Sequence, residues 1–251
     1  MPWLETASET FVARHDERDA SEATRVLAQL EYARARLQKR LDVDLGELAV
    51  VIHGSSAQLN AAQPWLPVER ALTAPAARRY VVGAATRTEL HVLSPRLLAR
   101  RASNVVGSLE MLMLTPSALL AKRALGGERR GAFARLAGRS AWRREGAAQH
   151  LAGQTKHLRP AIALRLHEGP APSFPPGRRD ALLLGGTIFD LLAREEGERA
   201  CDELARAPDP EAELEGAFRG RPLRQTEQAW RSHLARLARQ ASPSRFAATA
   251  P

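Results

Sequence analysis

The residue types that most often bind metals or act as nucleophiles are few and scattered in this chain. Its 251 residues include seven histidines and a single cysteine, Cys201. No two histidines are four residues apart, so no pair can place two imidazoles on one helix face to bind zinc. One cysteine excludes a disulfide framework and a zinc site built on several thiolates. Cys201 falls in a predicted helix with no histidine near it in the sequence, which favours an inert buried thiol.

Other motifs of known chemistry are also missing from the sequence. It has neither of the glycine-rich loops that cradle phosphates, Gly-x-x-x-x-Gly-Lys and Gly-x-Gly-x-x-Gly. It has no Gly-x-Ser-x-Gly turn to expose a nucleophilic serine. His150 and His157 are seven residues apart and would share a helix face, but a pair of this kind is more often on the surface than in a metal site. Short motifs alone therefore assign no activity.

Positive charge is concentrated between Arg96 and Arg144. This segment holds 11 basic and two acidic residues, which accounts for the whole formal net charge of +9. Such a segment can form a nucleic-acid interface. Only Phe133 and Trp142 supply aromatic rings there, however, so a solvated or helix-capping arginine face is the favoured interpretation. Nucleic-acid binding stays as an alternative function that we do not expect.

Composition indicates the class of protein. Only three of the 37 basic residues are lysine, and this usage is typical of a GC-rich bacterial gene. No run of about 18 apolar residues is present, so no membrane span is expected. The first five residues include Glu5 and do not begin an apolar core like that of a signal peptide. We therefore expect a bacterial, cytoplasmic protein.

The first half of the chain predicts helices mixed with strands. Apolar residues at near-helical spacing predict an amphipathic helix over Ser21–Leu41. The β-branched run Leu48–Ile52 predicts a buried strand. Tyr80–Gly83 and Glu89–Leu93 predict two further strands joined as a hairpin. The first half therefore combines a long helix with a small sheet.

Helices dominate from Pro95 onwards. Pro95 begins a predicted helix that runs to Met113, and Pro116 ends it or starts another. Four prolines and two glycines make 169–177 a loop. The helices predicted further along are Trp142–Ala152, Ala181–Arg194, Glu198–Ala207, Glu211–Phe218 and Leu223–Gln240. We predict an α+β fold in a single domain over 1–240, with an α/β lobe at 1–115, a helical lobe at 116–240 and a disordered tail at 241–251.

Three segments, in order, resemble a known family. They are Trp3–His15, the stretch Ser140–Gly153 with its Trp-Arg-Arg-Glu-Gly-Ala-Ala, and Ala181–Leu234, which ends in Glu-Gln-Ala-Trp-Arg-Ser-His-Leu. Together they resemble the peptidase-MA-like domains of bacterial zinc metallopeptidases, the gluzincins, over roughly residues 3–238. The resemblance implies a zincin-like fold: an N-terminal helix, a small mixed sheet with an edge hairpin, an active-site helix and an all-helical C-terminal lobe.

The resemblance also implies where a metal site would lie. Glu145 matches the family's third zinc ligand. The family's His-Glu-x-x-His, laid over Leu109-Glu-Met-Leu-Met113, matches its general base to Glu110 but replaces both histidines, by Leu109 and Met113. Neither leucine nor a thioether holds zinc as imidazole does. The zinc expected in the family is therefore predicted to be lost, and no cofactor is expected. The family's tyrosine also has no match, since the aligned position lies near Leu182.

The leading hypothesis is thus a catalytically inactive, metallopeptidase-like protein. It would keep the cleft and bind a peptide or protein by strand addition at Glu89–Leu93, taken as the edge strand. An active metallopeptidase with a nonstandard site of Glu110, Glu145 and His150 is the alternative, although Glu145 and His150 would lie about 140° apart around one helix. We further predict that Leu109, Leu112 and Met113 face inward on one helix, with Glu145 across a cleft from it.

Overall fold

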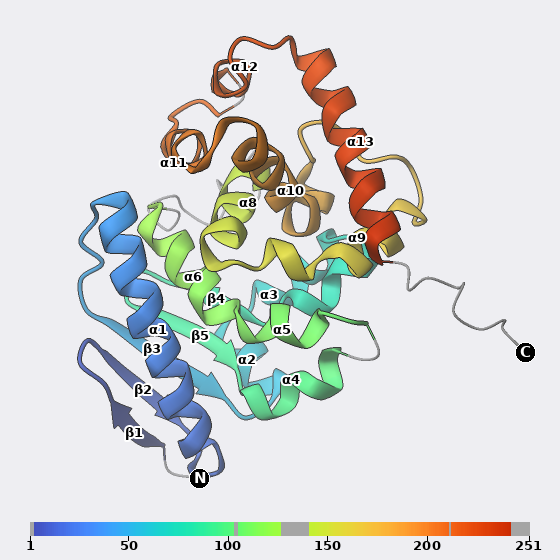
Figure 1. Ribbon diagram of the computed structural model, residues 1–251. Coiled ribbons are helices and arrows are strands. Elements are labelled where there is room, and N and C mark those ends of the chain that lie inside the picture. Colours follow the sequence, from blue (N-terminus) through green and yellow to red (C-terminus); the bar gives the residue numbers. More distant parts are fainter. Residues whose placement is uncertain (1–2, 103–104, 127–140, 211, 242–251) are drawn as a thin grey trace, which may run out of the picture.

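The computed structural model describes residues 3–102, 105–126, 141–210 and 212–241. Its fold is α+β, with a lobe built on a five-stranded sheet and a second lobe of helices (Figure 1). The strands are β1 (Leu4–Ala7), β2 (Phe11–His15), β3 (Leu48–His53), β4 (Gly83–Ala85) and β5 (Glu89–Leu93). The helices of the sheet lobe are α1 (Ala20–Leu41), α2 (Ser56–Ala62), α3 (Leu66–Leu72), α4 (Pro95–Ala102), α5 (Ser108–Met113) and α6 (Thr115–Ala124). Those of the helical lobe are α8 (Ala141–Ala152), α9 (Arg159–Leu166), α10 (Arg178–Glu196), α11 (Glu198–Arg206), α12 (Glu213–Ala217) and α13 (Leu223–Ala241).

The sheet is mixed and has the strand order β1-β2-β3-β5-β4. β2, β3 and β5 run parallel, while β1 and β4 lie antiparallel at the two edges. Alternating residues of β2 are buried and exposed, because one face of the strand packs on the core. The hairpin β4–β5 is confirmed. Its edge strand is β4, however, so the prediction that Glu89–Leu93 is an edge strand is wrong: β5 lies between β3 and β4.

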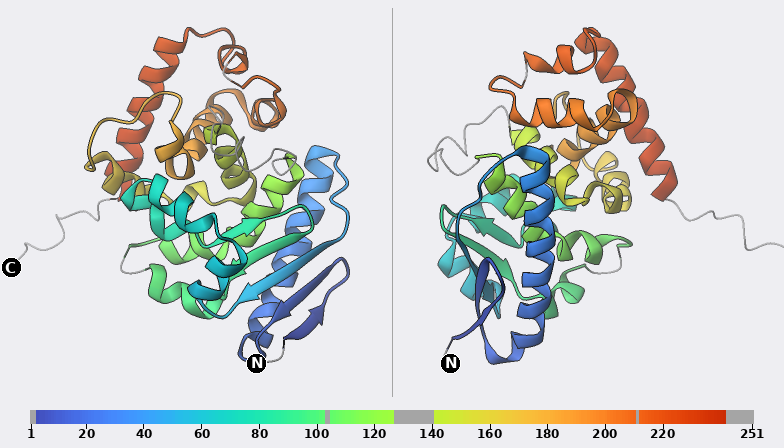
Figure 2. Two further views of the ribbon diagram at one scale, coloured as in Figure 1. Left: turned by 180° about the vertical axis from the view of Figure 1, so that it is seen from behind. Right: turned by 60° about the vertical axis from the view of Figure 1, so that its left-hand side comes forward.

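Helices cover both faces of the sheet. α1 and α6 pack together on one face, where the buried side of α1 meets apolar residues of β2, β3 and β5. α2 packs against β3 and β5, and it lies on the opposite face with α3 (Figure 2). The sequence patterns for α1 and β3 are confirmed to within one residue at each end.

The helical lobe is organised around the close crossing of α8 and α10. Gly146 and Gly185 meet at this crossing, and a Cβ built on either would lie within 2.4 Å of the other helix's main chain. Two glycines are therefore needed for the helices to approach so closely. The described residues after 140 form helices and connecting loops, as predicted, and 169–177 is a loop. The predicted tail at 241–251 lies outside the described residues apart from Ala241, which ends α13.

The predicted helix from Pro95 to Met113 is wrong. It is divided into α4 and α5, because Gly107 has a left-handed φ of +77° that a continuing helix does not allow. A Cβ on Gly107 would lie 2.6 Å from the carbonyl oxygen of His157, so glycine is required by the packing as well. The predicted strand at Tyr80–Gly83 is also displaced: Pro75–Tyr80 forms a 3-10 helix, η2, and the strand begins at Gly83. Among the described helices, none is long and apolar enough to cross a membrane.

Candidate functional site

A pocket of about 160 Å³ opens where the sheet lobe meets the helical lobe. Its walls come from elements far apart in the sequence: α3, β4, α6, α8 and the start of α10. The residues that carry charge there are Glu69, Lys122, Arg144, Glu145 and Arg178. A narrower extension of about 30 Å³ continues inward from the same residues towards Tyr80, Gln149 and Gln154. The pocket thus combines two carboxylates, three cations and the main chain of β4.

β4 is an edge strand of the sheet. Alternate residues on this side of the hairpin are hydrogen-bonded to β5: the Leu93 N–H donates to the Val82 carbonyl (2.9 Å), and the Thr86 N–H donates to the Glu89 carbonyl (2.8 Å). By the antiparallel register, Ala84 pairs with His91 in the same way. The main-chain N–H and C=O groups of Gly83 and Ala85 therefore point away from β5. Both residues line the pocket.

Lys122 and Glu145 form the central ion pair of the pocket. The Lys122 ammonium lies 2.6 Å from one Glu145 carboxylate oxygen, and Arg144 Nε lies 3.8 Å from the other. The side chain of Glu145 is only 8% exposed and that of Lys122 is 19% exposed. Burial raises the pKa of Glu145, but the two cations outweigh it and hold that pKa below its ordinary value. Glu145 is thus a carboxylate whose charge is already neutralised.

Glu69 reaches the same pocket from α3 and behaves in the opposite way. Its pKa lies above the ordinary value because burial disfavours the charged form, and the negative charge of Glu145 adds to this effect. The charge of Lys122 opposes the rise. The two carboxylates therefore share one nearby ammonium, which is bound to Glu145.

An apolar surface adjoins the mouth of the pocket. Trp65 is the N-cap residue of α3, and Val68 and Leu72 follow it at i+3 and i+7, so the three share one face of the helix. Their side chains are exposed, Trp65 by 55%, Val68 by 40% and Leu72 by 44%. Trp65 also lines the pocket. We call these three residues the α3 apolar face.

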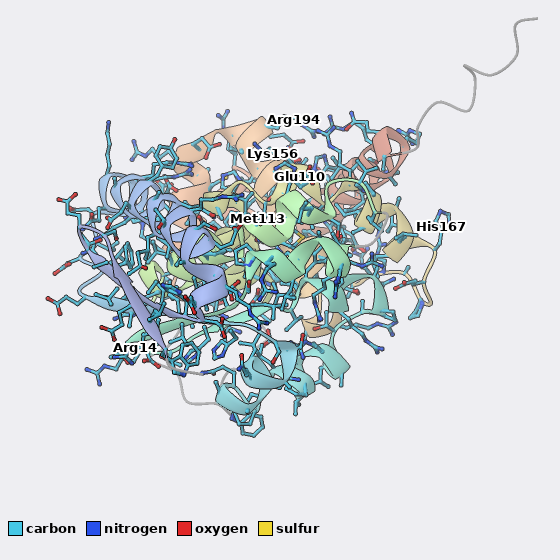
Figure 3. The ribbon with its side chains drawn as sticks, turned by 90° about the horizontal axis from the view of Figure 1, so that it is seen from below. Arg14, Glu110, Met113, Lys156, His167 and Arg194 are labelled. Atoms are coloured by element: carbon cyan, nitrogen blue, oxygen red, sulfur yellow. The ribbon has the colours of Figure 1, made fainter. Side chains whose placement is uncertain are left out.

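The residues predicted from His-Glu-x-x-His do not face Glu145. Leu109 is 39% exposed and Glu110 is exposed, whereas Leu112 is buried and Met113 is partly buried. Figure 3 shows Glu110 and Met113 on α5, which packs mainly against α4. Of the helices of the sheet lobe, α6 is the one that packs closely against α8. The prediction that Leu109 faces inward is therefore wrong, because the chain turns at Gly107 and restarts at Thr115. The helix α5 still reaches the inner extension of the Glu145 pocket, through Met111.

The alternative set Glu110, Glu145 and His150 is not brought together either. His150 Nε2 lies 2.9 Å from Glu198, and its ring stacks on Phe189 at 6.0 Å between centroids. Glu145 instead binds Lys122. The described residues contain no group of three or more His, Cys, Asp or Glu side chains placed to hold a metal ion.

Several described basic residues of the Arg96–Arg144 segment bind to separate parts of the fold. Arg96 binds Asp19, Arg101 binds the Arg79 carbonyl, Lys122 binds Glu145 and Arg143 binds the carbonyls of Ala205 and Ala207. Arg129, Arg130, Arg135 and Arg139 lie outside the described residues.

Zinc is the metal that the resemblance would place beside Glu145. The described residues of the pocket wall include no histidine or cysteine. The carboxylate of Glu145 is already held by an ammonium. These donors do not fit a zinc site, which needs imidazole or thiolate ligands beside the carboxylate.

Comparison of the chain with family models, curated proteins and solved structures finds no match. Function therefore has to be inferred from the pocket itself. Sequence reasoning identified Glu145 but missed Lys122, Glu69 and the strand β4. One feature of the sequence could have drawn attention to Lys122: it is one of only three lysines in an arginine-rich chain.

Proposed function

We propose that this protein is a non-catalytic, metallopeptidase-like protein that binds an extended peptide in the pocket between its lobes. The observation that carries this proposal is that β4 ends the sheet, with no strand beside its outer edge among the described residues. Gly83 and Ala85 offer two N–H donors and two C=O acceptors beside the pocket, and an added strand forms hydrogen bonds with such groups. The peptide would extend the sheet beyond β4.

The α3 apolar face supplies the second contact. A strand on β4 would project alternate side chains to either side. Those directed towards α3 would meet Trp65, whose exposed ring offers a large contact area at low cost in conformational entropy. We therefore propose that the bound peptide carries a large apolar side chain at this position. Main-chain pairing would supply affinity, and this side chain would supply selectivity.

Hydrolysis is not part of the proposal, because the polar residues of the pocket offer no source of an activated water. In a zinc peptidase the metal lowers the pKa of a bound water, and a glutamate accepts its proton. If the resemblance to gluzincins holds, we infer that the motif positions lie on α6, since this helix packs against α8, which carries Glu145. The residues at i, i+1 and i+4 that line the pocket or its extension are Ala118, Leu119 and Lys122. None of the three is a metal ligand or a general base of the family, and the ammonium of Lys122 would replace the metal as the partner of Glu145.

The test uses one substitution at both edges of the sheet. Ala85→Pro removes an outward N–H at β4, and proline is tolerated at such edge positions. Ala7→Pro is the matched control: Ser8 N–H donates to the Phe11 carbonyl, so the N–H of Ala7 also points outward, but at the β1 edge. The probes are fluorescein-labelled decapeptides selected on the parent protein from a proline-free display library.

We expect Ala85→Pro to weaken binding at least tenfold while Ala7→Pro leaves it unchanged. Trp65→Ala should weaken it as well. Failure to select any peptide, or equal binding by Ala85→Pro and the parent, would overturn the proposal. Loss of binding in Ala7→Pro alone would move the peptide to the opposite edge of the sheet.

A further inference from the structure

Three arginines that do not line the peptide pocket bind the main chain around η2 and α4. They are Arg70 of α3, Arg79 of η2 and Arg101 of α4, and each side chain is partly buried. Arg70 Nε donates to the Val81 carbonyl (3.0 Å) and Arg101 Nε donates to the Arg79 carbonyl (2.8 Å). Arg79 Nη1 donates to the Ala102 carbonyl (3.3 Å). These bonds link the three side chains through one stretch of main chain: Arg101 binds the carbonyl of Arg79, Arg79 binds the carbonyl next to Arg101, and Arg70 binds the carbonyl two residues after Arg79.

The charges of this cluster are not balanced by carboxylates. Among the described residues, no carboxylate oxygen lies within 4.0 Å of Arg70, Arg79 or Arg101 in an ion pair. Glu69 interacts with Arg70 at longer range, and Asn60 accepts a hydrogen bond of 2.7 Å from Arg70 Nη1. Burial, together with the charge of Arg70, lowers the pKa of Arg101. Like charges held this close, with few opposite charges, repel one another.

The N–H donors that these guanidinium groups do not use indicate what kind of ligand would bind them. Arg101 uses only its Nε in the contacts above, so both of its Nη groups stay available, as does Nη2 of Arg70. A guanidinium presents its donors as a planar fork that fits two oxygens of a phosphate or a carboxylate. Three such groups carry three positive charges, which favours a dianion over a single carboxylate.

We propose that Arg70, Arg79 and Arg101 form a binding site for a phosphate dianion, either free or as the terminal group of a small phosphorylated molecule. This site is separate from the peptide pocket and does not depend on the function proposed there. The anion would relieve the repulsion among the guanidinium groups, so its binding should stabilise the folded protein.

The experiment compares melting temperatures in sodium phosphate and in sodium chloride at matched ionic strength and pH. Arg101→Gln removes a guanidinium whose two Nη groups both lack a partner among the described residues. Arg100→Gln is the matched control, because it makes the same charge change at an exposed position of the same helix. We expect phosphate to raise the melting temperature of the parent and of Arg100→Gln by several degrees, and Arg101→Gln to lose most of that rise. Isothermal titration with phosphate and with glucose 6-phosphate separates a free ion from a phosphomonoester.

Arg79→Lys keeps the charge but removes the fork, and it serves if Arg101→Gln does not fold. It should bind phosphate at least fivefold more weakly than the parent. The proposal fails if phosphate and chloride act alike on the parent, or if both cluster variants keep the full phosphate response. Binding of a single-stranded RNA oligonucleotide that depends on Arg101, with no response to phosphate or glucose 6-phosphate, would assign the cluster to nucleic acid instead.

Discussion

Replacing Lys122 by methionine tests whether the pocket depends on its central ion pair. The change keeps a long apolar side chain but removes the ammonium that lies 2.6 Å from Glu145. Glu145 would then be a buried carboxylate with only Arg144, 3.8 Å away, as a close cation. Removing one partner of a buried pair costs about 3–5 kcal/mol. Because Lys122 is 19% exposed and Arg144 remains, we expect the lower end, about 3 kcal/mol.

Chemical denaturation measures this loss, and a double-mutant cycle attributes it to the pair. A loss of about 3 kcal/mol corresponds to roughly 6–12 °C in melting temperature for a chain of this size. Glu145→Gln in the Lys122→Met background should recover part of the loss, since it removes the unpaired charge. Lys39→Met, at an exposed position of α1, is the matched control and should change the free energy of unfolding by less than about 0.5 kcal/mol.

The pH dependence gives an independent check of the same pair. In the parent, the pKa of Glu145 is lowered on folding, so the stability that its charge contributes is present above about pH 4.5 and is lost as the pH falls through the lowered value. Lys122→Met lacks this contribution. The difference between the two proteins should therefore narrow below pH 4.5. A Lys122→Met protein as stable as the parent at pH 7, or additive effects of the two substitutions, would refute the buried pair.

Two further predictions concern other parts of the fold. Burial and the neighbouring ring of His91 lower the pKa of His53 to about 4, so the unfolded state binds more protons between about pH 6.5 and 4, and stability should fall by up to about 3 kcal/mol over that range. Denaturant titrations at pH 7 and 4.5 check this, and a His53→Gln variant whose stability falls as steeply as that of the parent would contradict it. The triple change Ala118→His, Leu119→Glu and Lys122→His restores the zinc motif on α6, and a zinc concentration of 100 Kd should then add about 2.7 kcal/mol of stability. Leu109→His with Met113→His, on α5, is the control and should not respond, and a zinc response of the control alone would return the motif to α5.

Local patterns in the sequence were sufficient where an element buries one continuous face. Over Ser21–Leu41 the apolar residues recur at helical spacing because that side of α1 packs on the sheet. The β-branched run at Leu48 forms the central strand β3 for the same reason. In the second half of the chain, glycines and prolines lie within a few residues of most helix ends.

The candidate site could not be predicted because long-range packing decides it. The apolar residues of Ser108–Met113 are consistent with a helix, but nothing local shows that Gly107 must turn the chain against His157. The motif match therefore fell on α5, whereas the pocket beside Glu145 is lined mainly by residues of α6 on this side. Lys122 and Glu145 are 23 residues apart in sequence (145 − 122) and meet only because α6 packs against α8. A contact of this kind produces no periodic pattern in the sequence from which the pair could be predicted.

Gly83 links the sheet edge to this ion pair. A Cβ at Gly83 would lie 2.7 Å from the His91 carbonyl oxygen and 2.9 Å from Leu119 Cδ1, so any larger residue would push β4 away from β5 and α6. The close approach of β4 to α6 places the outward main chain of Gly83 and Ala85 in the same pocket as Lys122. Because the ammonium of Lys122 neutralises Glu145, this pocket places the outward main-chain groups of β4 beside a carboxylate that is already paired. That juxtaposition is what supports our proposal that a peptide main chain binds along β4.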